Sequence, residues 1–215
     1  NSSYEVETFL ITESANEKYF DASVQMQRKS KNSYFISDTL SQKISETKNS
    51  QGVFAVYKMK NENISLKTGQ KYIALDNLQD PGNLGTVIRT AEALGISSVI
   101  VGGGCDVFNP KVLRASMGSV LRLDVFECQS LAPVLQKAKS LGIKTYATSP
   151  DSSAKKINET QFPKSSLCVI GNEANGVSDE VMNICDETVT IPMLGRAESL
   201  NAHVAGAIVM WEMLR

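Results

Sequence analysis

From about residue 70 to its end, the chain alternates short apolar runs with longer stretches in which apolar residues recur at helical spacing. The apolar runs predict β-strands at residues 72–75, 98–101, 124–127, 144–147, 167–170 and 188–191. The stretches with helical spacing predict helices at residues 84–94, 110–120, 131–141, 178–184 and 199–214. Regular alternation of strands and helices is typical of an α/β fold, in which helices cover both faces of a mostly parallel sheet.

The first part of the chain is more polar and less regular. Helical patterns occur at residues 21–28 and 38–45, and the best strand candidate is the apolar run at 52–57. The polar stretch 58–70, which contains a glycine, predicts a linker.

We place the domain boundary at this linker. A small α+β domain is expected over residues 1–68, and the larger α/β domain over residues 69–215. Because the chain opens without Met, we also expect the small domain to lack its beginning. Its one basic cluster is the Arg-Lys-Ser-Lys run at 28–31, which is either a solvated surface or a contact for an RNA backbone.

Composition limits the classes of function. Lys and Arg total 22 and Asp and Glu total 23, so the net charge of −1 argues against a nucleic-acid partner unless basic groups are concentrated locally. No run of about 18 apolar residues occurs, and we expect no membrane span. Because the cysteines form no C-x-x-C pair, we expect neither a zinc site nor disulfides, and we predict a cytoplasmic protein. They are Cys105, Cys128, Cys168 and Cys185.

The first candidate loop follows the strand predicted at 72–75. Residues 80–82, Asp-Pro-Gly, are typical of a turn, and Asn83 is a good N-cap for the next helix. Arg89 lies off the apolar stripe of that helix, four residues after Gly85. Because helical side chains lean toward the amino end, we expect Arg89 to lean over Gly85, where no side chain obstructs it, toward the loop. This guanidinium either holds a phosphate or a developing oxyanion, or is an ordinary surface arginine.

Two more candidate loops follow later strands. In residues 171–176, Gly-Asn-Glu-Ala-Asn-Gly, two glycines around Glu173 indicate either a backbone that approaches a ligand closely or a plain surface turn. Residues 191–198 lead into the last helix, which is apolar nearly all round and is therefore buried in a core or against another subunit. Ser199 either caps this helix or, with Asn201, serves a site at its exposed first turn.

Other kinds of site fit less well. The three glycines at 102–104 do not complete a G-x-G-x-x-G dinucleotide motif, because position 107 is Val107, and no G-x-x-x-x-G-K-[ST] loop occurs. The only histidine, His203, has no G-x-S-x-G partner, so we interpret it as a structural or surface residue. No metal-binding cluster is recognisable, and we expect no metal.

Three stretches, taken together and in order, resemble the SpoU, or TrmH-type, family of RNA ribose methyltransferases in the SPOUT class. They are residues 75–89, which include DPGNLGTVIR, residues 167–177, LCVIGNEANGV, and residues 191–201, IPMLGRAESLN. The resemblance covers about residues 71–215. The first part of the chain resembles, more weakly, the small substrate-recognition domain that often precedes this catalytic domain.

The resemblance implies a trefoil-knotted catalytic domain, S-adenosylmethionine bound in the knot, and a homodimer with the active site at the subunit interface. The positions that would hold the methyl donor are Gly171, Ile191, Leu200 and, in the same loop, Met193. The positions that match the functional polar residues of the family are Asn83, Arg89, Glu173, Ser199 and Asn201.

The implied reaction is methylation of a ribose 2′-hydroxyl in ribosomal or transfer RNA, without a metal. A guanidinium, with a pKa above about 12, is a poor base. Arg89 would therefore stabilise the developing alkoxide, and the proton would leave through a phosphate, water or Glu173. One departure from the family is the pair Ala202-His203, where a small apolar and then a small polar residue are usual. A catalytically silent RNA-binding protein on this fold and a small-molecule α/β enzyme stay open as alternatives.

Overall fold

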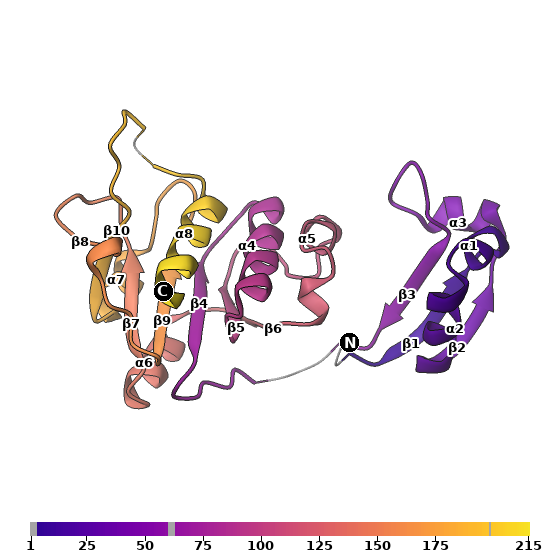
Figure 1. Ribbon diagram of the computed structural model, residues 1–215, viewed down its shortest axis with the longest axis horizontal. Helices are drawn as coiled ribbons and strands as arrows, with labels where there is room; N and C mark the ends of the chain where they lie inside the picture. Colours follow the sequence, from indigo (N-terminus) through magenta and orange to yellow (C-terminus); the bar gives the residue numbers. More distant parts are fainter. Residues whose placement is uncertain (1–3, 60–62, 198) are drawn as a thin grey trace. The chain divides into compact units, whose positions relative to one another are not determined.

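The chain forms two compact units, Asn1–Asn61 and Glu62–Arg215. The computed structural model describes residues 4–59, 63–197 and 199–215. Each unit has its own sheet and its own hydrophobic core (Figure 1). Within these ranges, no helix combines the length and the hydrophobicity that a membrane crossing requires.

The linker predicted over 58–70 contains residues 60–62, which lie outside the described ranges. Its later part already belongs to the second unit. Leu66 is buried in a core of that unit, and the Lys67 amide donates a hydrogen bond of 2.7 Å to the Tyr72 hydroxyl. The second unit therefore begins within the predicted linker.

The first unit is a three-stranded sheet with helices packed on it. Strand β1 lies in the centre, parallel to β2 and antiparallel to β3. The elements are β1 (Val6–Ile11), α1 (Glu13–Lys18), α2 (Phe20–Lys29), β2 (Ser30–Phe35), α3 (Asp38–Ile44) and β3 (Val53–Tyr57). Helices α2 and α3 and strand β3 confirm the predicted elements, whereas α1, β1 and β2 were not predicted. Strand β2 is exposed along nearly its whole length, so its sequence carries no apolar pattern.

The second unit is built on a seven-stranded sheet in the order β6-β5-β4-β9-β7-β10-β8, and its neighbouring strands pair in parallel. The strands are β4 (Lys71–Asp76), β5 (Ser98–Gly102), β6 (Asp124–Cys128), β7 (Lys144–Thr148), β8 (Lys155–Lys156), β9 (Ser166–Ile170) and β10 (Glu187–Thr190). The helices are α4 (Pro81–Leu94), α5 (Pro110–Ala115), α6 (Ala132–Ser140), α7 (Asp179–Ile184) and α8 (Ala202–Leu214), with short 3-10 turns η1 (Ser119–Leu121) and η2 (Ile157–Glu159). The predicted parallel sheet is confirmed.

Helices cover both faces of this sheet. Ile73 and Leu75 of β4 pack in a core with α4 and α8, whereas Tyr72 and Ala74 pack in a second core with α6 and α7. Successive residues of a strand point to opposite faces, so the two cores lie on opposite sides of the sheet. Strands buried on both faces read as continuous apolar runs, which explains why the pattern predicted them.

Strand β9 comes late in the chain yet lies between β4 and β7, near the centre of the sheet (Figure 1). Because the pairs are parallel, the carboxyl ends of β4, β9, β7 and β10 lie along one edge. In such sheets ligands bind beyond this edge. The three candidate loops, which follow β4, β9 and β10, are therefore gathered at one place.

The helix predicted over residues 110–120 is wrong in its second half. Helix α5 ends at Ala115. Shortly after it, Met117 and Gly118 have positive φ values of 51° and 82°. These backbone angles are incompatible with a right-handed helix. The chain continues instead into the short turn η1.

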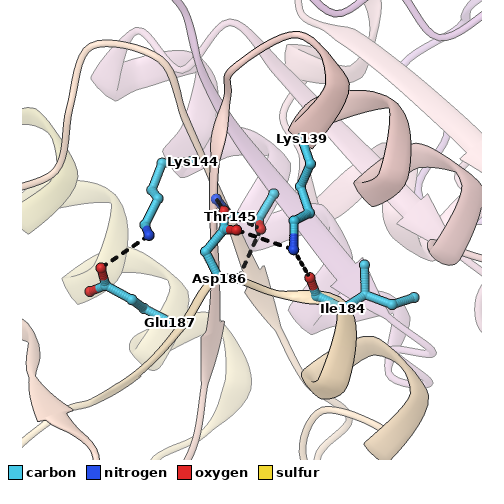
Figure 2. A network of polar contacts seen from close by, with 6 residues as sticks. All are labelled: Lys139, Lys144, Thr145, Ile184, Asp186 and Glu187. Carbon is cyan, nitrogen blue, oxygen red and sulfur yellow. Dashed lines mark hydrogen bonds and ion pairs between the residues drawn. The ribbon is translucent and has the colours of Figure 1, made fainter.

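A polar network lies at the amino ends of strands β7 and β10, at the opposite end of the strands from the candidate loops (Figure 2). Asp186 Oδ2, just before β10, accepts hydrogen bonds from the amide (2.8 Å) and hydroxyl (2.9 Å) of Thr145 on β7. Lys139 of α6 lies 3.2 Å from Asp186 Oδ1 and donates to the Ile184 carbonyl at 2.8 Å. Burial acts to raise the pKa of Asp186, but the hydrogen bonds from Thr145 and Lys139 outweigh it and the pKa is lowered. Because this network holds the strand beginnings, its role is structural.

Candidate active site

A pocket of about 260 Å³ opens at the carboxyl ends of β7, β9 and β10. It is lined by all four predicted donor-binding residues, which are Gly171, Ile191, Met193 and Leu200. Two of the predicted polar residues, Glu173 and Ser199, also line it. Much of the remaining wall is apolar and comes from Ile170, Ala202 and Ala205. The second and third candidate loops thus form one cavity.

The loop after β9 is a tight turn. Asn172 and Gly176 form an antiparallel bridge whose two backbone hydrogen bonds are 2.9 and 3.0 Å long. A Cβ on Gly171 would lie 2.1 Å from the carbonyl carbon of Gly176 and 2.2 Å from the Val177 amide. Glycine is therefore required at 171 by the loop's own backbone, and close approach of a ligand is not needed to explain it.

Glu173 lies at the pocket with three hydrogen-bond donors around its carboxylate. Asn83 Nδ2 donates to Oε1 at 2.9 Å, and the amides of Asp80 and Gln79 donate at 3.3 Å each. Burial acts to raise the pKa of Glu173, but the Asn83 amide and these backbone donors outweigh it, and the pKa lies below its usual value. A carboxylate held in this way is ionised at neutral pH and is a weak base.

Asn83 does not cap α4, contrary to the sequence prediction. The N-cap is Asp80, whose Oδ1 accepts from the Asn83 amide at 2.9 Å. The Asn83 side chain is 7% exposed and is bound at both ends. Its Nδ2 donates to Glu173, and its Oδ1 lies 2.9 Å from Nδ1 of His203. Because Asp80 caps α4, the Asn83 side chain is available to connect the first candidate loop to the second candidate loop and to the last helix.

The interpretation of His203 as a structural or surface residue missed this contact. The ring is partly buried and belongs to the polar cluster next to the pocket. One signal in the sequence pointed to it, namely that a histidine replaces the small residue usual in the resembling family. The contact itself joins residues 120 positions apart and could not be deduced from local pattern.

Arg89 is placed differently from the expectation. Gly85 is not open space: a Cβ there would lie 2.6 Å from Cβ of Ala115 and 2.7 Å from the Val112 carbonyl. Gly85 therefore allows α5 to pack closely on α4 and cannot give Arg89 a path to the loop. Arg89 is exposed, does not line the pocket, and forms no hydrogen bond or ion pair with another residue in the described ranges.

Ser199 and Asn201 have separate positions. Helix α8 begins at Ala202, three residues later than predicted, and its N-cap is Asn201, whose Oδ1 accepts from the His203 amide at 3.0 Å. Ser199 therefore does not cap the helix and lies exposed in the pocket wall. Asn201 does not line the pocket. Of the five predicted polar residues, the structure gathers Glu173, Asn83 and Ser199 around or next to the pocket.

Helix α8 presents an apolar surface as well as a buried face. Its buried residues are Ala202, Gly206, Val209, Met210 and Met213. Outside this face, Val204 and Leu214 are exposed and Trp211 is 62% exposed. Large exposed apolar side chains grouped on one element are typical of an interface. Among the described residues, no group of three His, Cys, Asp or Glu side chains is arranged to hold a metal.

Comparisons with known proteins agree on one family. The family model of the SpoU rRNA Methylase family matches residues 70–211. The chain is 36% identical over 181 residues to the 23S rRNA (guanosine(2553)-2′-O)-methyltransferase RlmP of Bacillus subtilis (strain 168), a match that covers 84% of this chain and 71% of that protein.

Solved structures show the same fold over nearly the whole chain. The SpoU methyltransferase AviRb from Streptomyces viridochromogenes, in complex with the cofactor AdoMet, superposes with a TM-score of 0.85 and 27% identity, covering 99% of this chain and 83% of that one. A TrmH-family RNA methyltransferase from Porphyromonas gingivalis, described as putative, superposes with a TM-score of 0.83 and 29% identity, covering 98% and 83%.

Proposed function

The chain belongs to the SpoU rRNA methylase family, and we infer that it is an S-adenosylmethionine-dependent enzyme that methylates a ribose 2′-hydroxyl in RNA. The Bacillus relative is named as a ribosomal RNA 2′-O-methyltransferase, and the Streptomyces neighbour holds AdoMet. The observation that carries the proposal for this chain is the pocket, because Gly171, Ile191, Met193 and Leu200 all line it.

The pocket suits the methyl donor. Its apolar side chains, among them Ile191 and Leu200, can enclose a flat adenine ring, and backbone groups beyond the strand ends can bond its polar edges. Glu173 is the charged residue among those that line the cavity, and its carboxylate favours a ligand with a positive centre. When bound, S-adenosylmethionine supplies a methyl group on a positively charged sulfur, which an oxygen nucleophile can attack.

Glu173 acts as an organiser rather than as the proton acceptor. Three donors surround its carboxylate and lower its pKa, and a carboxylate with a low pKa accepts a proton poorly. Its charge instead holds the pocket rim in place through Asn83. The proton of the 2′-hydroxyl then leaves through an RNA phosphate or through water.

Arg89 supplies positive charge to the reacting oxygen. A guanidinium stays protonated at any working pH, so it stabilises a developing alkoxide or grips the adjacent phosphate. The exposed position of Arg89 on α4 supports contact with a large, negatively charged substrate. Ser199 in the pocket wall and Asn201 at the start of α8 position donor and ribose, and the reaction needs no metal.

The first unit serves RNA recognition in this proposal. Of its basic run, Arg28 and Lys29 are exposed at the end of α2. Lys31 instead forms ion pairs with Glu5 and Glu7, whose hydrogen bonds raise its pKa to about 12. Within this run, Arg28 and Lys29 are therefore the cations available to a phosphate backbone. Exposed aromatic side chains of the unit can stack on bases, and they are Phe20, Tyr34 and Phe35.

The protein acts as a homodimer through α8. The exposed Trp211, Val204 and Leu214 support this arrangement, because an isolated chain would leave this apolar surface in water. The proposal includes the trefoil knot that the family implies. The position of β9, which follows β7 in the chain but lies between β4 and β7 in the sheet, supports the knot. The proposal also includes a cytoplasmic location.

The test is methyl transfer in vitro. The purified protein is incubated with S-adenosylmethionine labelled on its methyl group and with total RNA from cells that lack the gene. Digestion of the RNA to nucleosides should place the label on a ribose 2′-oxygen. A label on a base, or no transfer to either ribosomal or transfer RNA, contradicts the proposed function.

A further inference from the structure

One chain of hydrogen bonds through His203 joins the three candidate loops. Asn201 Oδ1 accepts from the His203 amide at 3.0 Å, and the His203 ring meets Asn83 Oδ1 at 2.9 Å. Asn83 Nδ2 in turn donates to Glu173 at 2.9 Å. The third, first and second loops are connected in that order, and His203 is the link between the last helix and the other two.

The chemistry of Glu173 decides which way the Asn83 amide points. The two carboxylate oxygens also face the backbone amides of Asp80 and Gln79, which can only donate. Glu173 is thus an acceptor, and the Asn83 atom beside it must be the NH₂ group. The Asn83 carbonyl oxygen then faces His203, and a carbonyl can only accept. Nδ1 of His203 therefore carries a hydrogen.

We propose that His203 is a positioning residue for methyl transfer, whose Nδ1–H fixes the Asn83 amide so that Asn83 holds Glu173 at the pocket. Because Asn83 is buried, water does not readily replace a lost donor at its carbonyl. Without that donor the Asn83 amide is held at its nitrogen alone, and its side chain can swing out of line with the Glu173 carboxylate. His203 does not line the pocket itself, so it acts through these two residues.

The first test is spectroscopic and does not depend on activity. The chain contains one histidine, so protein labelled with ¹⁵N-histidine gives an unambiguous spectrum. Long-range ¹H–¹⁵N correlation on the full chain should show, for the neutral ring, a protonated Nδ1 and an unprotonated Nε2. A ring protonated on Nε2 alone would overturn the proposal, because its Nδ1 could not donate to Asn83.

The second test separates the hydrogen bond from the bulk of the ring. His203→Leu keeps an apolar side chain of similar reach and removes the donor, whereas His203→Asn offers an amide N–H near the position of Nδ1. Single-turnover methyl transfer at saturating S-adenosylmethionine should slow roughly tenfold in His203→Leu and should recover in His203→Asn. Ser140→Ala, which removes one exposed hydrogen bond of 2.7 Å on α6, is the control and should keep the wild-type rate.

The outcomes separate this inference from the function on which its kinetic part rests. A folded His203→Leu variant with the wild-type rate, or a folded His203→Asn variant without recovery, overturns the positioning role. An active enzyme whose His203 ring is protonated on Nε2 alone also overturns the positioning role, but it does not affect the proposed function. A protein with the Nδ1–H tautomer that methylates no RNA overturns the proposed function, and with it the kinetic role of His203, while the hydrogen bond stands.

Discussion

Asn83 and Glu173, ninety residues apart in the chain, are joined by a hydrogen bond of 2.9 Å from Nδ2 to Oε1. The bond is possible because β4 and β9 pair in parallel, so the loops that follow them leave the sheet side by side. It connects the first turn of α4 to the rim of the pocket. Asn83 and Glu173 are thus bound to each other, and Asn83 holds the Glu173 carboxylate in place.

Gly171→Ala should abolish most donor binding. The new Cβ would lie 2.1 Å from the Gly176 carbonyl carbon, so the turn after β9 must open and distort the pocket wall. We expect a loss of about 1–3 kcal/mol in the free energy of unfolding and at least a roughly tenfold weaker affinity for S-adenosylmethionine. Calorimetry in the presence of a chelator, with thermal melting alongside, measures both.

Gly195→Ala is the matched control for this substitution. A Cβ at Gly195 meets no atom within 4 Å, so donor affinity and melting temperature should stay at the wild-type values. Wild-type affinity in Gly171→Ala would remove the loop after β9 from the donor site. Binding by the wild type that the chelator abolishes would contradict the metal-free proposal.

Arg89→Ala should leave folding intact and slow the chemistry. The side chain is exposed and has no partner in the described ranges, so no packing or ion pair is lost. Loss of one group that stabilises an oxyanion typically costs about 10²–10³ in rate, and Lys should restore little because it lacks the planar fork. Single-turnover methylation at saturating RNA is the measurement.

Arg122→Ala should show the reverse pattern. Arg122 donates to Glu92 at 2.8 and 2.9 Å, so its loss should lower the melting temperature and spare the rate. If Arg89→Ala melts normally and methylates as fast as the wild type, Arg89 has no part in the reaction.

Trp211→Glu should convert a dimer into a folded monomer. The side chain is 62% exposed in the single chain, so the substitution should be tolerated there. At a dimer interface it would bury an unpaired carboxylate, which is strongly unfavourable. Sedimentation at micromolar concentration checks this, with Leu141→Glu at the end of α6 as the control that should stay dimeric. A monomeric wild type would refute the proposed dimer.

The stabilising contribution of Asp186 should be lost in acid. Its folded pKa lies below the ordinary 3.8, so it contributes stability above that value and loses it as the pH falls through the folded pKa. Asp186→Asn should therefore be less stable than the wild type by about 1–3 kcal/mol at pH 7, and the difference should shrink as the pH falls below 3.8 and through the folded pKa. Melting curves from neutral to acid pH measure this, and a difference that grows in acid would show that the assigned sign is wrong.

The sequence predicted the sheet and the place of the site for a physical reason. Strands buried on both faces, such as residues 167–170 of β9, are built mainly from apolar residues, and a parallel sheet brings the loops after its strands to one edge. The exposed strand β2 needs no such pattern, and local sequence did not reveal it.

Partners across the fold could not be predicted from local sequence. Both Asp80 and Asn83 are good capping residues, and only the fold shows that Asp80 caps α4 and leaves Asn83 for Glu173. Gly85 looked like open space because its neighbour, α5, is distant in sequence. The contact of His203 with Asn83 depends on the packing of α8 against α4 in the same way.

Whether this pocket supports methylation of a ribose 2′-hydroxyl is tested most directly by a map of 2′-O-methyl groups in the RNA of the source organism. The map is compared between cells with the gene, cells without it, and deleted cells that carry either the wild type or Glu173→Gln. One 2′-O-methyl group should vanish on deletion, return with the wild type and stay absent with Glu173→Gln, whose amide cannot accept from all the donors around residue 173. An unchanged map of 2′-O-methylation, or the loss of a base methylation in its place, would contradict the account.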